Sequence, residues 1–429
     1  MPRFHVHNFG CRASQADGAA IEAALSGQGW QPAATSSQAG LVVLNTCTVT
    51  AFADEDVRKA VHRVHRENPD ARILITGCYA QRAPEELAVL PGVYWVVGNS
   101  HKMQIPEIVA EPAAPYHGQV HVGDIFAARE FLSAPVEDAA GERTRPNLKI
   151  QDGCNNRCSF CIIPFVRGRS RSAPADQVVD QVRGLAARYR EVVLSGINLG
   201  RWGREMGGTL RLAGLVRQLL AETAIERLRL SSVEPMDWSD DLLELMATSA
   251  RIAKHVHAPL QSGSDRVLRR MHRKYRPRHY ADRIGRARAA MPDAAIGADV
   301  MTGFPGESDE EFEESRAFIE SLPFTYLHVF TYSERPGTPA AENPDQVPMD
   351  VRKERNRVLR ELAARKNAEF RRTMIGRTLS VVTLSEGALS DNFLRVELAH
   401  PRPANQLVDV QIGSLTPVGL REQGALTVL

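Results

Sequence analysis

The stretch Gly153–Cys161, which reads GCNNRCSFC, places three cysteines in one short loop with the spacing Cys-x3-Cys-x2-Cys. No cysteine follows it in the rest of the chain. Three soft thiolate ligands on a tight loop favour an iron–sulfur cluster. Because three thiolates cannot ligate all four irons of a four-iron cluster, one iron would stay open to a substrate or cofactor. We therefore interpret Cys154, Cys158 and Cys161 as cluster ligands at a catalytic centre.

Two other interpretations of this loop are weaker. A structural zinc site needs a fourth ligand, and His117 and His121 do not lie at a spacing familiar from zinc sites. A disulfide inside so short a loop would be strained and would leave one cysteine over.

The loop resembles the cluster loop of radical S-adenosylmethionine (radical SAM) enzymes. That resemblance implies that the open iron chelates the amino and carboxylate groups of SAM. It also implies that an electron from the cluster, supplied by a reducing donor, breaks the sulfonium bond and yields a 5′-deoxyadenosyl radical.

The bulk composition is that of an ordinary globular protein. The chain has 429 residues, enough for two or three domains, with 43% hydrophobic and 24% charged residues. A net charge of +2 does not by itself indicate a partner. The sequence shows no signal peptide and no apolar run approaching 18 residues. We expect a cytoplasmic monomer, not associated with membranes, whose six cysteines stay reduced.

Residues 1–110 alternate between expected strands and helices. The strands are expected at 4–9, 41–44, 72–76 and 95–97, and the helices at 14–26 and 54–67. Apolar strands separated by amphipathic helices predict a doubly wound parallel sheet. Cys11, Cys47 and Cys78 each follow one of these strands, so they could converge at one sheet edge. Spacing alone leaves open whether they form a second cluster site or are unrelated buried cysteines.

Residues 111–146, rich in proline, predict a linker that contains one short strand near 119–125. Residues 147–373 again alternate, and predict an incomplete (β/α)6 barrel of the TIM type with its site at the C-terminal strand ends. Its strands are expected at 148–150, 192–194, 228–230, 255–260, 296–301 and 326–330, and a long helix at 349–374 closes the region. The cysteine loop follows the first of these strands.

Polar residues lie in the later strands or follow them, where a ligand would bind. They are Ser195, Asn198, Ser231, Glu234, Gln261 and Asp299. Singly, each is explained by the polarity of loops and helix caps. As a ring at the barrel mouth beside a cluster loop, they favour a SAM pocket, with Glu234 and Asp299 as polar contacts.

Five further stretches narrow the resemblance to the methylthiotransferases, a radical SAM family with three domains. They are Thr76–Gln81, Ile163–Ser172, Leu260–Ser264, Gly303–Glu307 and Tyr332–Thr338. The resemblance covers nearly the whole chain. It implies that Cys11, Cys47 and Cys78 bind an auxiliary four-iron cluster, and that the chain ends in a small RNA-binding β-barrel called the TRAM domain.

Family members modify isopentenyladenosine in tRNA, threonylcarbamoyladenosine in tRNA, or an aspartate of a ribosomal protein. The segments Gly77–Gln81 and Arg167–Ser172 most resemble the threonylcarbamoyladenosine branch. The stretch Asn8–Gln15 departs from the usual Gly-Cys-Lys-x-Asn-Gln form around its cysteine.

Residues 374–429 change to short β-rich runs, which predict a small barrel of a size that many RNA-binding modules use. Basic residues cluster elsewhere, beside the cysteine loop and in the segment Arg266–Arg278. A charge run is usually a solvated face, but acidic residues are scarce within this segment, and such patches attract phosphates. The candidate tRNA contacts are Arg167, Arg169, Arg171, Arg269, Arg270, Arg273 and Lys274.

Together these features predict an enzyme with two [4Fe-4S] clusters and SAM that methylthiolates carbon two of threonylcarbamoyladenosine next to the anticodon. An unactivated C–H bond requires a radical cofactor, which the protein binds and orients. Isopentenyladenosine and the ribosomal aspartate are the alternative substrates. A non-catalytic iron–sulfur RNA-binding protein is the alternative of another class.

Overall fold

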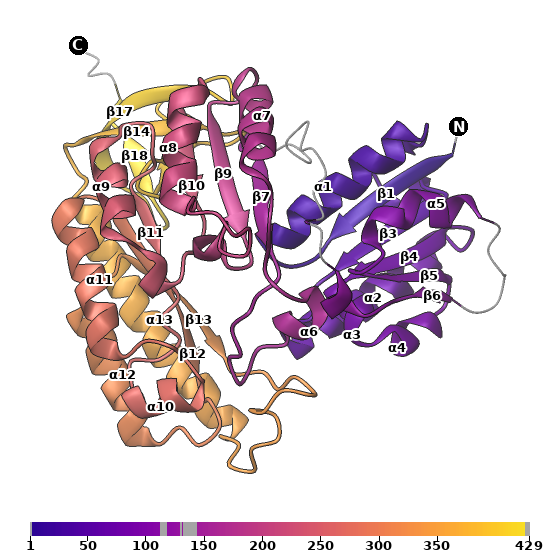
Figure 1. Ribbon diagram of the computed structural model, residues 1–429. Helices are drawn as coiled ribbons and strands as arrows, with labels where there is room; N and C mark the ends of the chain where they lie inside the picture. Colours follow the sequence, from indigo (N-terminus) through magenta and orange to yellow (C-terminus); the bar gives the residue numbers. More distant parts are fainter. Residues whose placement is uncertain (1, 112–117, 129–130, 132–143, 425–429) are drawn as a thin grey trace.

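The computed structural model describes residues 2–111, 118–128, 131 and 144–424. Figure 1 shows three parts in chain order: an N-terminal sheet with helices, a central β/α region, and a small C-terminal barrel. Most of the predicted linker lies outside the described residues. None of the described helices combines the length and apolarity needed to span a bilayer.

The N-terminal part is a parallel sheet of six strands in the order β2-β1-β3-β4-β5-β6. The strands are β1 Arg3–Asn8, β2 Gln31–Pro32, β3 Leu41–Thr46, β4 Arg72–Gly77, β5 Val93–Gly98 and β6 Gln119–His121. The helices are α1 Arg12–Gly27, α2 Ala51–Glu67, α3 Cys78–Arg82, α4 Pro84–Ala88 and α5 Ile105–Ala110. Every residue of β3 is buried, which explains its unbroken apolar run.

The predicted boundary of this domain at residue 110 needs a correction. β6 pairs in parallel with β5, so the segment predicted as a linker contains the last strand of the N-terminal sheet. The short run near 119–125 is predicted as a strand of the linker because its pairing partner is not visible in its own sequence, and the strand found there ends at His121.

The central part is an open barrel built from two sheets, with orders β10-β9-β7-β8 and β11-β12-β13. Its strands are β7 Asn147–Asp152, β8 Arg171–Ser172, β9 Glu191–Gly196, β10 Arg227–Leu230, β11 His255–His257, β12 Ala295–Thr302 and β13 Tyr326–Thr331. Its outer helices are α7 Ala175–Ala186, α8 Leu212–Glu222, α9 Asp240–Thr248, α10 Asp265–Arg270, α11 Pro277–Ala290, α12 Asp309–Ser321 and α13 Met349–Arg372. A short helix, α6 Ile163–Arg167, follows the cysteine loop.

The six predicted barrel strands are all present, and the prediction of an incomplete barrel is confirmed. Strand β11 stops at His257, earlier than predicted, although the N–H groups of Ala258 and Leu260 still donate to carbonyl oxygens of β12. A single parallel bridge from Leu228 to Ile252 links the two sheets. Helix α1 of the N-terminal part lies beside β7, at the open side of the barrel (Figure 1).

The C-terminal part is a closed barrel with the strand order β14-β15-β16-β18-β17. The strands are β14 Thr378–Thr383, β15 Ala388–Ser390, β16 Arg395–Glu397, β17 Leu407–Leu415 and β18 Leu420–Glu422. The strand predicted near 415–418 is wrong, because β17 continues to Leu415 before the chain turns into β18.

This barrel packs on the N-terminal ends of the core strands, away from the cysteine loop. Arg229 of β10 donates to the carbonyl oxygen of Ser390 at 2.9 Å and forms a buried ion pair with Glu191 of β9. Phe393 stacks on His255 at a ring distance of 4.3 Å. The C-terminal part therefore helps to close the end of the core barrel at which its strands begin.

Candidate active site

The loop that carries Cys154, Cys158 and Cys161 is folded back against the segment that follows α6. It begins at Gly153, whose φ of +68° favours glycine. A Cβ at this position would lie 2.1 Å from the carbonyl oxygen of Arg169. The backbone N–H of Cys154 donates to the carbonyl oxygen of Gly168 at 3.1 Å. These contacts fix the loop at the C-terminal end of β7.

The N-terminal cysteines lie at the ends of three neighbouring strands. Cys11 follows β1, Cys47 follows β3, and Cys78 is the first residue after β4, and these strands are adjacent in the sheet. Gly10 packs so closely on Cys47 that a Cβ there would lie 2.5 Å from the Cys47 Cβ. Burial, together with the nearby Cys78 and Cys11, raises the pKa of the Cys47 thiol to about 12. The three thiols therefore share one site.

The segment that follows Cys161 packs against the N-terminal triad across the domain boundary. Ile162 and Val166, just after Cys161, pack against Cys78 in one apolar cluster. The side chain of Asn99 donates to the carbonyl oxygen of Val166 at 2.7 Å, and its Nδ2 lies 3.7 Å from Cys78 Sγ. The end of one cysteine loop is thus the neighbour of the other triad.

Both triads are wider than a site for a single ion. Among the residues that the structure describes, only one group of His, Cys, Asp and Glu side chains has three ligand atoms all within 4.8 Å of one another, and it contains no cysteine. Six thiols in two open groups suit clusters better than zinc.

Hydrogen-bond donors surround the sulfurs of the core triad. Arg273 Nη1 lies 3.2 Å from Cys158 Sγ, and its other Nη donates to Glu234. The backbone N–H of Asn156 and the amide of Asn198 lie 3.4 Å and 3.7 Å from Cys154 Sγ. Such donors stabilise negative charge on ligand sulfur and tune the potential of a cluster.

A buried charge network lies between the domains. Asp17 and Lys102 come from the N-terminal part, and Lys149, Asp152 and Arg167 come from the core. Burial alone would raise the pKa of Asp17, but Lys102, Lys149 and Arg167 hold it well below its ordinary value. Three cations face two carboxylates, so the network carries surplus positive charge.

Arg167 joins this network to the auxiliary cysteines. Burial would lower its pKa, but Asp152, Cys78 and Asp17 reverse this and raise it. The prediction that Arg167 contacts tRNA is wrong, because its side chain is 2% exposed and both ends of its guanidinium are occupied. The buried position of Arg167 near Cys78 instead allows its positive charge to balance the negative charge of cysteine thiolates.

Two other arginines of the predicted RNA surface are also buried. Arg171 donates to the carbonyl oxygen of Arg167 at 2.8 Å, and Arg273 points to Cys158, so neither faces RNA. Arg169, Arg269 and Lys274 are exposed.

The expected scarcity of acidic partners in the Arg266–Arg278 segment is also wrong. Asp265, Glu311 and Glu314 pair with its arginines, among them Arg269 and the half-buried Arg270. The segment sequence could not show this, because two of these carboxylates lie on α12.

Three of the predicted SAM contacts have buried polar atoms without a hydrogen-bond partner. These atoms are Asn198 Oδ1, Ser231 Oγ and Gln261 Oε1. Gln261 also has a φ of +67°, a conformation that is costly for a side chain of this type. Buried polar atoms normally have partners, so these atoms fit a polar ligand such as SAM. Asn198 also lines a pocket of about 170 Å³ together with Asn155, Ser170 and Lys274.

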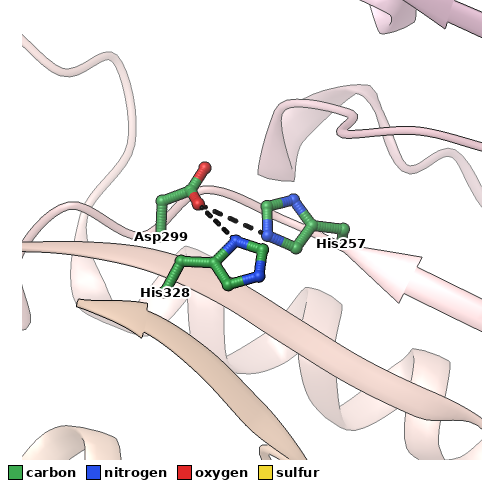
Figure 2. A group of neighbouring side chains, drawn as sticks. All are labelled: His257, Asp299 and His328. Atoms are coloured by element: carbon green, nitrogen blue, oxygen red, sulfur yellow. Dashed lines mark hydrogen bonds and ion pairs between the residues drawn. The ribbon is translucent and has the colours of Figure 1, made fainter. Parts of the chain in front are cut away.

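The other three predicted contacts already have partners. The Ser195 hydroxyl donates to the carbonyl oxygen of Leu148 at 3.4 Å, within the sheet. Glu234 pairs with Arg273. Asp299 lies between His257 and His328 (Figure 2). Burial would raise the pKa of Asp299, but the two histidines hold it below its ordinary value.

The comparisons with known proteins agree with this arrangement. Residues 148–319 match the radical SAM superfamily, and residues 3–98 match a family described as uncharacterized protein family UPF0004. The chain is 37% identical over 405 residues to the threonylcarbamoyladenosine tRNA methylthiotransferase MtaB of Aquifex aeolicus, covering 94% of this chain and 98% of that one. The chain belongs to the radical SAM methylthiotransferase family. As a methylthiotransferase it uses SAM and a [4Fe-4S] cluster.

Other methylthiotransferases are similar over much of the chain. The MtaB of Bacillus subtilis is 40% identical, covering 83% of this chain and 79% of that protein. The tRNA-2-methylthio-N(6)-dimethylallyladenosine synthase of Pelotomaculum thermopropionicum is 32% identical, covering 92% and 89%. Among solved structures, the radical SAM methyltransferase TsrM from Kitasatospora setae has a TM-score of 0.58 at 16% identity, covering 80% of this chain and 77% of that one. That likeness confirms the fold.

Several residues of this methylthiotransferase site were not found by sequence reasoning. Asp17, Lys102, Lys149 and Asp152 form the buried network, and Asn99 lies beside Cys78. The one available cue was a lysine inside a strand, at Lys149 between Leu148 and Ile150. A charged side chain in a buried strand requires a buried partner.

Proposed function

We propose that this protein transfers a methylthio group to carbon two of threonylcarbamoyladenosine in tRNA, next to the anticodon. The observation that carries the proposal is the packing of Ile162 and Val166, which follow Cys161 in the chain, against Cys78 of the other triad. A reaction that joins sulfur to a radical centre needs both sites to reach one nucleotide, and this packing brings the segment after one triad against the other.

The six cysteines would form two cluster sites with different roles. Cys154, Cys158 and Cys161 would hold the SAM-binding cluster, and Cys11, Cys47 and Cys78 would hold an auxiliary cluster. When bound, the first cluster would supply reductive cleavage of SAM, and the auxiliary cluster would supply sulfur. The chain itself positions them: Arg273 and Asn198 donate toward ligand sulfurs, and Arg167 supplies buried positive charge beside the auxiliary triad.

The polar atoms of Asn198, Ser231 and Gln261 would orient SAM in the barrel mouth, because they are buried and lack other partners. The exposed Arg169, Arg269 and Lys274 would contact tRNA phosphates near the same end. The C-terminal barrel, residues 374–429 as predicted, would bind another part of the tRNA. Residues 147–373 would form the radical SAM core.

The substrate branch rests on the relatives. The proteins from Aquifex aeolicus and Bacillus subtilis, at 37% and 40% identity, are threonylcarbamoyladenosine enzymes by name. The dimethylallyladenosine synthases from Pelotomaculum thermopropionicum and Acidothermus cellulolyticus reach 32% and 33%. The higher identity to the first two proteins favours threonylcarbamoyladenosine as the substrate. Isopentenyladenosine is the alternative.

The test is nucleoside mass spectrometry of tRNA from a deletion strain, complemented with the wild-type gene or with Cys47→Ala. We expect loss of the methylthio form of threonylcarbamoyladenosine, restored only by the wild type. Loss of the methylthio form of isopentenyladenosine instead would move the protein to the other branch. Unchanged tRNA would overturn the proposal.

A further inference from the structure

A group of side chains of the kinds that bind metal ions lies in the core barrel, apart from the cysteines. His257, Asp299 and His328 come from β11, β12 and β13, and Figure 2 shows both imidazole rings directed at one oxygen of Asp299. Their ligand atoms all lie within 4.8 Å of one another.

The strand register explains why the three side chains meet. Asp299 pairs directly with His328, and His257 pairs with Gly297, two residues before Asp299 on the same strand. Residues two apart on a strand share a face, so all three side chains project to one side of the sheet. Gly297 has no side chain to separate them, and a Cβ there would lie 2.0 Å from the ring of Tyr326.

The distances are those expected between neighbouring ligands of one ion, and the shorter of them also fits a hydrogen bond from His328 to Asp299. His257 Nε2 lies 3.5 Å and His328 Nδ1 lies 3.2 Å from Asp299 Oδ1. Neighbouring ligands of a tetrahedral zinc ion with bonds near 2.1 Å are separated by about 3.4 Å. The observed separations agree with that value.

His257 also has an outer partner of the type that metal-binding histidines use. Its Nδ1 lies 2.7 Å from the hydroxyl oxygen of Ser232. With the proton on Nδ1 and donated to Ser232, the lone pair of Nε2 is directed toward the carboxylate. Nε2 is buried and makes no hydrogen bond, on a side chain that is 6% exposed. In this tautomer, a cation between the buried acceptor and the anionic oxygen that it faces would satisfy both atoms.

We propose that His257, Asp299 and His328 bind a divalent transition-metal ion, for which zinc is the probe. Two imidazoles and one carboxylate form a ligand set for such an ion, and three protein ligands leave at least one position open. His328 is 61% exposed, which gives the ion a path from solvent. This proposal does not depend on the RNA substrate.

The test uses the cluster-loaded protein, treated with chelator, desalted and then given zinc. Zinc stands above ferrous iron in the affinity order of divalent ions, so residual iron would be displaced. We expect about one bound zinc ion per chain, with a zinc X-ray absorption spectrum that fits nitrogen and oxygen ligands at about 2.0–2.1 Å. Sulfur scattering at about 2.3 Å would place the zinc on cysteines and overturn the proposal.

His328→Ala and Asp299→Ala test the ligands, with His279→Ala as the control on an exposed histidine of α11. His328→Ala removes a mostly exposed side chain, so the fold and the iron content should be unchanged. We expect zinc affinity, measured by competition with a chromophoric chelator, to fall more than about tenfold in the two ligand variants only. Equal affinity in all four proteins, or no zinc uptake by the wild type, would overturn the proposal.

Discussion

Arg167 Nη2 lies 2.9 Å from Asp17 Oδ2, although the two residues are 150 positions apart in the chain. This ion pair crosses from α1 to the segment after the cysteine loop and is buried at both ends. It ties the position of the core loop to the sheet that carries Cys11, Cys47 and Cys78.

Replacing Arg167 with methionine should weaken this interface. The change removes the buried ion pairs that Arg167 makes with Asp17 and Asp152, and breaking such pairs costs about 3–5 kcal/mol. We expect a lower midpoint in urea unfolding and less iron bound by the N-terminal triad. Arg169→Met, at an exposed neighbouring position, is the control and should match the wild type. Equal midpoints in both variants would show that the network contributes no stability.

Single cysteine replacements should separate the two proposed clusters. Cys161→Ala and Cys47→Ala each remove one ligand from a different triad, so each variant should keep about half of the iron of the wild type. The measurement is iron content with Mössbauer spectroscopy after anaerobic reconstitution. SAM cleavage should survive in Cys47→Ala and be lost in Cys161→Ala. Full loss of iron in either variant would mean that the triads share a single cluster.

Arg273→Leu should lower the reduction potential at the core triad. Its guanidinium lies 3.2 Å from Cys158 Sγ, and positive charge there stabilises the reduced, more negative form of a cluster. We expect a decrease on the order of 60 mV, equal to a tenfold change for a one-electron couple. A redox titration followed by electron paramagnetic resonance measures it. Arg269→Leu, on the exposed face of α10, should leave the potential unchanged; an equal decrease there would exclude a local effect.

Acid should weaken the junction between the core and the C-terminal barrel. Burial would raise the pKa of Glu191, but Arg229 and other arginines lower it to about 2. Its carboxylate therefore contributes stability that is complete above its unfolded pKa near 4.5 and is lost as the pH falls toward 2. That contribution is about 3 kcal/mol.

Urea unfolding of the wild type and Glu191→Gln between pH 6 and pH 3 tests this linkage. The stability difference between the two proteins should be constant above about pH 5 and shrink below it. A difference that stays constant down to pH 3 would show that Glu191 does not titrate in this range.

The longer strands could be predicted because the apolar pattern of each is visible in its own local sequence. The apolar runs of β3 and β4 and the cysteines after them gave the N-terminal sheet and the place of its triad. Arg167 could not be assigned, because its run of alternating arginines resembles a solvated patch and its partner Asp17 is distant in sequence. The group of His257, Asp299 and His328 depends on the register of three strands, which no single segment specifies. β8 and β15 were missed because strands of two or three residues carry too little periodicity.

The ion pair between Asp17 and Arg167 joins a residue that is synthesised early to one that is synthesised 150 positions later. It can therefore form only late during synthesis on the ribosome. The first 110 residues leave the exit tunnel before β7 and α6 are synthesised, so Asp17 and Lys102 can pair with each other but not yet with Lys149 and Arg167. The side chain of Cys78 likewise cannot pack against Ile162 and Val166 until the segment after the cysteine loop has emerged. The proposed auxiliary cluster site would thus be completed only after the nascent chain has passed residue 167, and iron delivered earlier would meet an unfinished site.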